Sequence, residues 1–219
     1  MVATNPSTPQ LRDPFWPGPL SLPQALTDAL RLTPEQFALL CRANPDAVME
    51  LAADGSLISM TPTGSETGGR NGALLVELGL ALRNGRLAYK LFDSSTGFRL
   101  RDGSVRSPDA SLVALERWRA LTVEERQGFA PLCPDLVVEL ASSSDDGPRG
   151  LAALRQKMDL YQANGARLGW LLIPAERAVE VWKADDAAVQ PLRLEAATRL
   201  DGGETLAGLA IELEEIWAG

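Results

Sequence analysis

The chain has 219 residues, of which 45% are hydrophobic and 23% are charged, and 29 acidic residues against 21 Lys and Arg give a net charge of −8. This length favours one domain with a buried core, and the acidic balance argues against a protein that coats nucleic acid non-specifically. Histidine is absent, which excludes Ser-His-Asp and Cys-His hydrolases, histidine-ligated zinc enzymes and nucleases with a histidine base. Any catalysis must use carboxylates, lysine, tyrosine, a hydroxyl group or a cofactor.

Cysteine usage and hydropathy predict a soluble protein of a reducing compartment, with the cytoplasm as the expected location. Cys41 and Cys133 are far apart and form no CxxC motif, so the sequence indicates neither a disulfide framework nor a zinc knuckle. The most apolar stretch, residues 168–173, is far shorter than the roughly 18 residues that span a membrane. No membrane association is expected.

The N-terminal third predicts an extended arm, a helix and a hairpin. Six of the 15 prolines lie within residues 1–23, and because proline removes backbone donors and restricts φ, we expect an arm ahead of a single domain over 24–219. The segment TPEQ at 33–36 predicts a helix start with a capping box, and this helix should end before Asn44-Pro45. Asp54-Gly55, between two apolar runs, predicts a β-hairpin with a primed turn.

The remaining two thirds predict helices and strands in turn. Apolar residues at helical spacing predict helices over 66–83 and 151–164, the second ended by Gly165 in the left-handed conformation. Thr122 with Glu125 predicts the start of a short helix. Apolar runs predict strands near residues 86–92, 97–101, 105–114, 136–141, 168–173, 179–183 and 189–194, with a closing segment at 211–217. This order predicts an α/β domain with a mixed sheet.

Glu139 is an anomaly, because it lies inside Leu136–Ala141, the strand whose composition is most typical of a protein core. Alternation along the strand puts Val137, Glu139 and Ala141 on one face. An ionised carboxylate buried there costs several kcal/mol unless it is paired, hydrogen-bonded or bound to a cation. Glu139 is therefore a candidate site residue, and an edge strand on which it faces water is the alternative.

Asp109 and Lys157 are the next candidates. Asp109 shares a face of the predicted strand 105–114 with Ser111, although Asp after proline is also a common turn residue. Two carboxylates on neighbouring strands would make a hard oxygen site suited to Mg²⁺. Lys157 lies at the margin of the apolar face of the helix over 151–164, where it either extends into solvent or reaches the two acids and stabilises charge on a nucleophile or phosphate.

An ordered set of short motifs extends over residues 45–217. In chain order they are MTPTG at 60–64, SSTGFRL at 94–100, RSPDAS at 106–111, FAPLCPDLVVEL at 129–140, KM at 157–158, NGARLGWLL at 164–172 and IW at 216–217. As an ordered set they closely resemble the Uma family of restriction-endonuclease domains, which belongs to the PD-(D/E)XK nuclease superfamily. The resemblance implies a restriction-endonuclease-like fold, in which helices flank a mixed β-sheet core.

The resemblance also implies a site. Asp109 and Glu139, on adjacent strands, would hold Mg²⁺, for which Mn²⁺ should substitute. The superfamily lysine normally stands two residues after the second acid, where this chain has Ala141, and the resemblance places it instead at Lys157. Glu66 is the nearest match to an assisting acid on the first helix, and Glu77 is a weaker match. Magnesium would then activate a water for attack on a DNA phosphodiester, and Lys157 would orient that water or offset the developing charge.

DNA is thus the expected substrate, and a homodimer is the expected state because two-fold symmetry suits cleavage of two antiparallel strands. A cluster of basic residues would line one side of a DNA groove, although solvated strand charges explain it equally well: Arg83, Arg86, Lys90, Arg99, Arg101 and Arg106. Two alternatives remain. One is a nuclease-like fold kept as a binding or assembly module without catalysis. The other is a carboxylate-pair hydrolase such as a glycosidase, which the 5% aromatic content disfavours.

Overall fold

The structure of the chain is a computed structural model that describes residues 29–60, 63–145, 147–184 and 190–219. The predicted proline-rich arm over residues 1–23 lies outside the described residues. Within the described ranges, no helix combines the length and the hydrophobicity that crossing a membrane requires.

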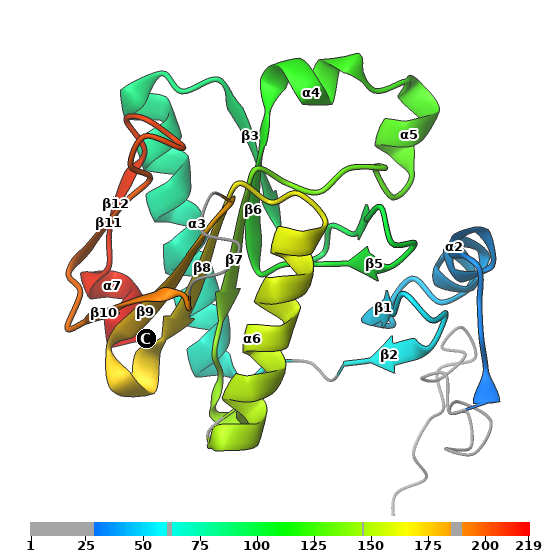
Figure 1. Cartoon of the computed structure of the whole chain (residues 1–219), viewed down its shortest axis with the longest axis horizontal. Helices are drawn as coiled ribbons and strands as arrows, with labels where there is room; N and C mark the ends of the chain where they lie inside the picture. Colours follow the sequence, from blue (N-terminus) through cyan, green and yellow to red (C-terminus); the bar gives the residue numbers. More distant parts are fainter. Residues whose placement is uncertain (1–28, 61–62, 146, 185–189) are drawn as a thin grey trace, which may run out of the picture.

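A six-stranded mixed sheet forms the centre of the protein, in the order β10-β9-β8-β7-β6-β3 (Figure 1). β7 and β8 are its one parallel pair, because helix α6 carries the chain back across the sheet between them. The predicted mixed sheet is therefore confirmed. Its strands are β3 (Tyr89–Asp93), β6 (Ala110–Ala114), β7 (Leu136–Leu140), β8 (Leu168–Ile173), β9 (Ala178–Lys183) and β10 (Leu192–Glu195).

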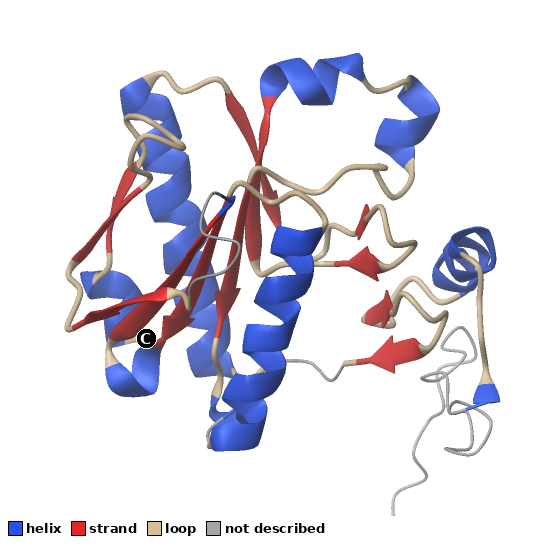
Figure 2. Ribbon diagram, viewed as in Figure 1, coloured by secondary structure: helices blue, strands red, loops and turns tan. Residues whose placement is uncertain are grey.

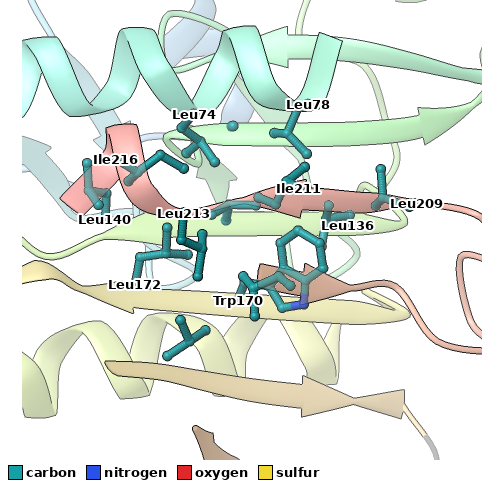
Figure 3. Packing of buried hydrophobic residues seen from close by; sticks show 14 of the residues in the cluster. Leu74, Leu78, Leu136, Leu140, Trp170, Leu172, Leu209, Ile211, Leu213 and Ile216 are labelled. Carbon is teal, nitrogen blue, oxygen red and sulfur yellow. The ribbon is translucent and has the colours of Figure 1, made fainter. Parts of the chain in front are cut away.

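Helices cover both faces of this sheet, with α6 (Pro148–Ala163) on one face and α3 (Ser65–Gly85) with α7 (Glu214–Ala218) on the other (Figures 1 and 2). Leu74 and Leu78 of α3 pack against Leu136 and Leu140 of β7 (Figure 3). Val137 packs instead with the α6 layer. Successive residues of β7 thus face opposite layers, as the alternation of a strand predicts.

A four-stranded sheet lies beside the main sheet, in the order β2-β1-β5-β4. Its strands are β1 (Met49–Leu51), β2 (Leu57–Ser59), β4 (Phe98–Arg99) and β5 (Val105–Arg106). Helix α2 (Pro34–Ala43) packs on it through Phe37, which is fully buried. The remaining elements are α4 (Leu115–Ala120), α5 (Val123–Gln127), the hairpin β11 (Arg199–Asp201) with β12 (Ala210–Glu212), and the 3-10 turns η1 (Ser143–Asp145) and η2 (Pro174–Glu176).

The local helix signals and the predicted hairpin, β1 with β2, are confirmed, whereas the continuous strand predicted over 105–114 and the predicted type of the hairpin turn are wrong. Both capping boxes form, at Thr33 and Thr122, and Gly165 has a φ of 103°. The predicted strand 105–114 is divided between two sheets as β5 and β6, because Pro108 has no N–H for a ladder and the Ser107 N–H donates to a glutamate side chain. The hairpin turn is not a primed one, since Gly55 alone of the Asp54-Gly55 pair has a positive φ, 83°.

Two leucines of α3 provide a matched test of this packing. Leu78 is fully buried against the sheet, whereas Leu80 is 44% exposed. We expect Leu78→Ala to lower the free energy of unfolding in urea by about 2–5 kcal/mol, because it leaves a cavity in the core. Leu80→Ala should change it by less than about 1 kcal/mol. Equal losses for the two variants would contradict the assigned orientation of α3.

Candidate active site

The pairing of β6 with β7 brings Asp109 and Glu139 to the same place. Ala110 is opposite Val138 in this antiparallel ladder, so Asp109, one residue earlier, stands beside Glu139. β7 lies between β6 and β8 inside the sheet, and Glu139 is only 3% exposed. The alternative that Glu139 faces water from an edge strand is therefore wrong.

Helix α6 supplies the partners of Glu139 from two positions one turn apart. The Lys157 Nζ lies 2.9 Å from the Glu139 Oε1, and the Tyr161 hydroxyl donates to the same oxygen at 3.0 Å. The Lys157 side chain is 16% exposed, so it reaches the acids rather than extending into solvent. The structure thus brings together three of the four predicted site residues: Asp109, Glu139 and Lys157.

Glu50 of β1 completes the cluster, and sequence reasoning missed it. The Lys157 Nζ lies 3.0 Å from the Glu50 Oε1, while Arg106 Nη1 contacts the Glu50 Oε2 at 2.9 Å. Glu50 is 2% exposed. The signal that singled out Glu139 was also present here, because Glu50 is an acid between Met49 and Leu51 in a short apolar strand.

Asp109 is held by the backbone of the neighbouring strand. The Leu140 N–H donates to its Oδ2 at 2.8 Å, and the Asn71 side chain of α3 also hydrogen-bonds to it. Burial raises the pKa of Asp109 above its ordinary value, because the bond from Leu140 and the nearby Lys157 only partly offset the loss of hydration.

Charge in the cluster is unevenly balanced. Burial raises the pKa of Glu139 to about 8, with Lys157 opposing the rise and Asp109 and Glu50 adding to it. Burial also acts against ionisation of Glu50, yet Lys157, the Ser107 N–H and Arg106 together hold its pKa below the ordinary value. The pKa of Lys157 is raised, because Glu139 and Glu50 outweigh its desolvation. The three acids Asp109, Glu139 and Glu50 thus face only two cations, Lys157 and Arg106. Asp109 and Glu139 are the two acids whose negative charge is incompletely compensated.

This pair fits a divalent cation. Carboxylates whose ionisation is disfavoured by burial and by neighbouring acids gain most from a nearby positive charge. Among the described residues, no group of three or more Asp, Glu or Cys side chains converges in a metal-binding arrangement. Mg²⁺, however, typically takes one or two protein carboxylates and completes its octahedron with water and substrate phosphate. Asp109 and Glu139 meet that smaller requirement.

A cavity of about 480 Å³ opens where β7 ends. The first turn of α3, Ala141 and Ser142 after β7, and η2 line it. Glu66 lies on this wall, where its side chain is 73% exposed and forms an ion pair with Arg70. The structure therefore places Glu66 at the cavity, outside the buried cluster. Glu77 lies further along α3, where it accepts a hydrogen bond from the Glu212 N–H.

The predicted basic groove is not seen as one continuous set of free cations. Arg106 is committed to Glu50, and Arg99 pairs with Glu35 at 2.9 Å. Lys90 lies over the rings of Phe92 and Trp118. These three side chains serve internal contacts, as ordinary strand charges do.

The site thus joins Asp109, directly before β6, with Glu139 of β7 and Lys157 of the crossover helix. It lies in a mixed sheet flanked by helices, which is a nuclease fold. The solved structure described as "a putative nuclease belonging to DUF820 from Anabaena variabilis ATCC 29413" shares it, with a TM-score of 0.66 and 14% identity over 85% of this chain and 98% of that one. The family model Uma2, described as "Putative restriction endonuclease", matches residues 34–214. The chain therefore belongs to the Uma2 family. Comparison with curated proteins gives no match.

The pKa of Glu139 predicts how stability depends on pH in the metal-free protein. The folded state keeps a proton up to about pH 8 that an unfolded Glu, with a pKa of 4.5, has already released. This stabilisation is complete below the unfolded pKa and is lost as pH rises through the folded one. Between about pH 5 and pH 8, the free energy of unfolding of Glu139→Gln should therefore fall by roughly 3–4 kcal/mol less than that of the wild type.

Urea denaturation in EDTA at a series of pH values measures this difference. The exposed Glu124 of α5 provides a control, since Glu124→Gln should follow the wild-type pH dependence. If Glu139→Gln and the wild type lose stability in parallel, Glu139 does not titrate in this range and the electrostatic account of the cluster is wrong.

Proposed function

We propose that this protein is a metal-dependent endonuclease that hydrolyses DNA phosphodiester bonds. One observation carries the proposal: Asp109, directly before β6, stands beside Glu139 of the neighbouring strand β7, and the Lys157 ammonium lies 2.9 Å from Glu139. Burial raises the pKa of both acids. Membership of a family described as restriction endonucleases supports the reaction class. The absence of histidine agrees with it, because this chemistry needs only acids, a lysine and a metal.

Each residue has a role that follows from its position. Asp109 and Glu139 would hold the cation, Mg²⁺ or Mn²⁺, through hard carboxylate oxygens. When bound, such a cation lowers the pKa of a water and neutralises charge on a phosphate. Lys157 holds an ammonium beside these acids, where it can stabilise negative charge as the phosphodiester is attacked. Glu66 is kept as the assisting acid, since it lines the cavity at the end of β7.

A catalytically inactive binding or assembly module is the second candidate. Two observations favour it: the usual motif position holds Ala141, and Lys157 already neutralises part of the acidic cluster without any metal. Calorimetric titration with MnCl₂ separates the two candidates. The nuclease proposal expects saturable binding that Glu139→Ala abolishes, whereas an inert module binds no Mn²⁺ in either protein.

Cleavage of plasmid and linear DNA in Mg²⁺ or Mn²⁺ tests the proposed roles. Asp109→Ala, Glu139→Ala and Lys157→Ala should each lower the cleavage rate by at least about 100-fold. The first two remove ligands of the cation, and the third removes the ammonium that stabilises negative charge on the phosphate. Glu66→Gln should have a smaller effect of about tenfold. Glu124→Gln, an acid-to-amide change on the exposed side of α5, should leave the rate unchanged. An undiminished rate in Asp109→Ala or Glu139→Ala would refute the assignment.

We also propose that the protein acts as a homodimer in the cytoplasm. A two-fold axis would present two sites to the two strands of a duplex. Both cysteines are free, in agreement with a reducing compartment. Sedimentation equilibrium of the full chain tests the dimer, and a single species of 23.5 kDa at all concentrations would contradict it.

A further inference from the structure

Glu50 stands apart from the two proposed metal ligands in what it contacts. Its Oε1 receives the Lys157 ammonium at 3.0 Å and the Ser107 N–H at 2.8 Å, and its Oε2 receives Arg106 at 2.9 Å. All three donors therefore converge on one carboxylate that is 2% exposed. A carboxylate with three charged or backbone donors is fixed in both position and ionisation.

The donors of Glu50 belong to segments that also form the proposed metal site. Ser107 lies two residues before Asp109, and its carbonyl accepts from the Lys157 Nζ at 3.4 Å. Lys157 is thus held between β1 and the strand that leads into Asp109. Glu50 lies in the smaller sheet and Glu139 in the main sheet, so the two carboxylates contact Lys157 from different elements.

A cation bound by Glu139 would weaken the bond between Glu139 and Lys157, because the cation and the ammonium repel each other and draw on the same carboxylate. In the structure both donors to Glu139, Lys157 and Tyr161, use its Oε1. Without a second anchor, the Lys157 side chain would move away on metal binding. Glu50 provides that anchor.

We propose that Glu50 is a positioning residue, which holds the Lys157 ammonium beside Asp109 and Glu139 while these two acids bind a divalent cation. This inference rests on the proposed nuclease function and adds a residue to it. Glu50 touches neither the DNA nor the metal; it acts through Lys157.

A double-mutant cycle on DNA cleavage tests this indirect action. At saturating Mn²⁺ and with the DNA concentration varied, Glu50→Gln should lower kcat by about 10- to 100-fold and change KM by less than about twofold, since Glu50 acts on the reaction through Lys157 and does not contact the DNA. In a Lys157→Met background, the same Glu50→Gln change should have no further effect on kcat. An equal loss in both backgrounds, or no loss in either, would overturn the proposal.

A second measurement does not depend on cleavage. Lys157 should give a slowly exchanging ammonium signal in ¹H–¹⁵N spectra, assigned by its loss in Lys157→Met. We expect the signal to persist when Mg²⁺ is added to the wild type and to disappear when Mg²⁺ is added to Glu50→Gln. Persistence in both proteins, or loss in both, would refute the role of Glu50, whereas absence of cleavage by the wild type would refute the nuclease function alone.

Glu50→Asp guards against a folding defect in Glu50→Gln. It keeps the charge but shortens the side chain by one methylene, so it should fold, retain the ammonium signal in Mg²⁺ and lower kcat less than Glu50→Gln does. Circular dichroism and the Tm establish that each variant is folded. A folded Glu50→Asp that loses the signal as completely as Glu50→Gln would contradict an anchor based on charge.

Discussion

One buried ammonium joins the two sheets of this protein. The Lys157 Nζ contacts Glu139 on the main sheet and Glu50 on the smaller sheet, at 2.9 and 3.0 Å. Together with the Ser107 N–H and Arg106 it offsets the desolvation of Glu50, but it offsets only part of the desolvation of Glu139. Removing one partner would leave a buried charge uncompensated at a cost of about 3–5 kcal/mol. This contact forms only because β1, α6 and the turn before Asp109 are packed close to one another.

The same contact explains why stability alone does not account for the site. Well-packed apolar residues of similar volume often stabilise a fold as well as a buried ion pair does, or better. The chain instead places an acid in each of two otherwise apolar strands, Glu50 in β1 and Glu139 in β7. Burial raises the pKa of Glu139 and of the neighbouring Asp109. A site that is strained without a cation and relieved by one is what a metal-dependent hydrolase requires.

Most of the fold could be predicted from local signals and strand periodicity. The capping boxes at Thr33 and Thr122, the left-handed Gly165 and the alternation of β7 depend on residues near one another in sequence, so they could be recognised from it. The division of residues 105–114 between two sheets could not, because it depends on Glu50 taking the Ser107 N–H across 57 positions. The short helix α4 and strand β11 carry no comparable local signal.

The candidate site shows the same limit. Glu139 could be predicted as a site residue because a carboxylate in an apolar strand is unfavourable by itself. The same reasoning would have singled out Glu50. Its partnership with Lys157 could not be predicted, since nothing in the spacing of β1 and α6 shows that they meet. Glu66 illustrates the converse. A motif match made it a candidate assisting acid, whereas in the structure it lies at the cavity, outside the buried cluster, and pairs with Arg70.

In the proposed site, Asp109 and Glu139 together would bind a divalent cation next to a fixed Lys157. A crystal structure of the protein soaked in Mn²⁺, with anomalous data collected to locate the metal, tests it most directly. We expect an anomalous peak between the two carboxylates, with the Lys157 ammonium within a few ångströms of it and still in contact with Glu50. A structure with no metal between them and Lys157 in solvent would contradict it.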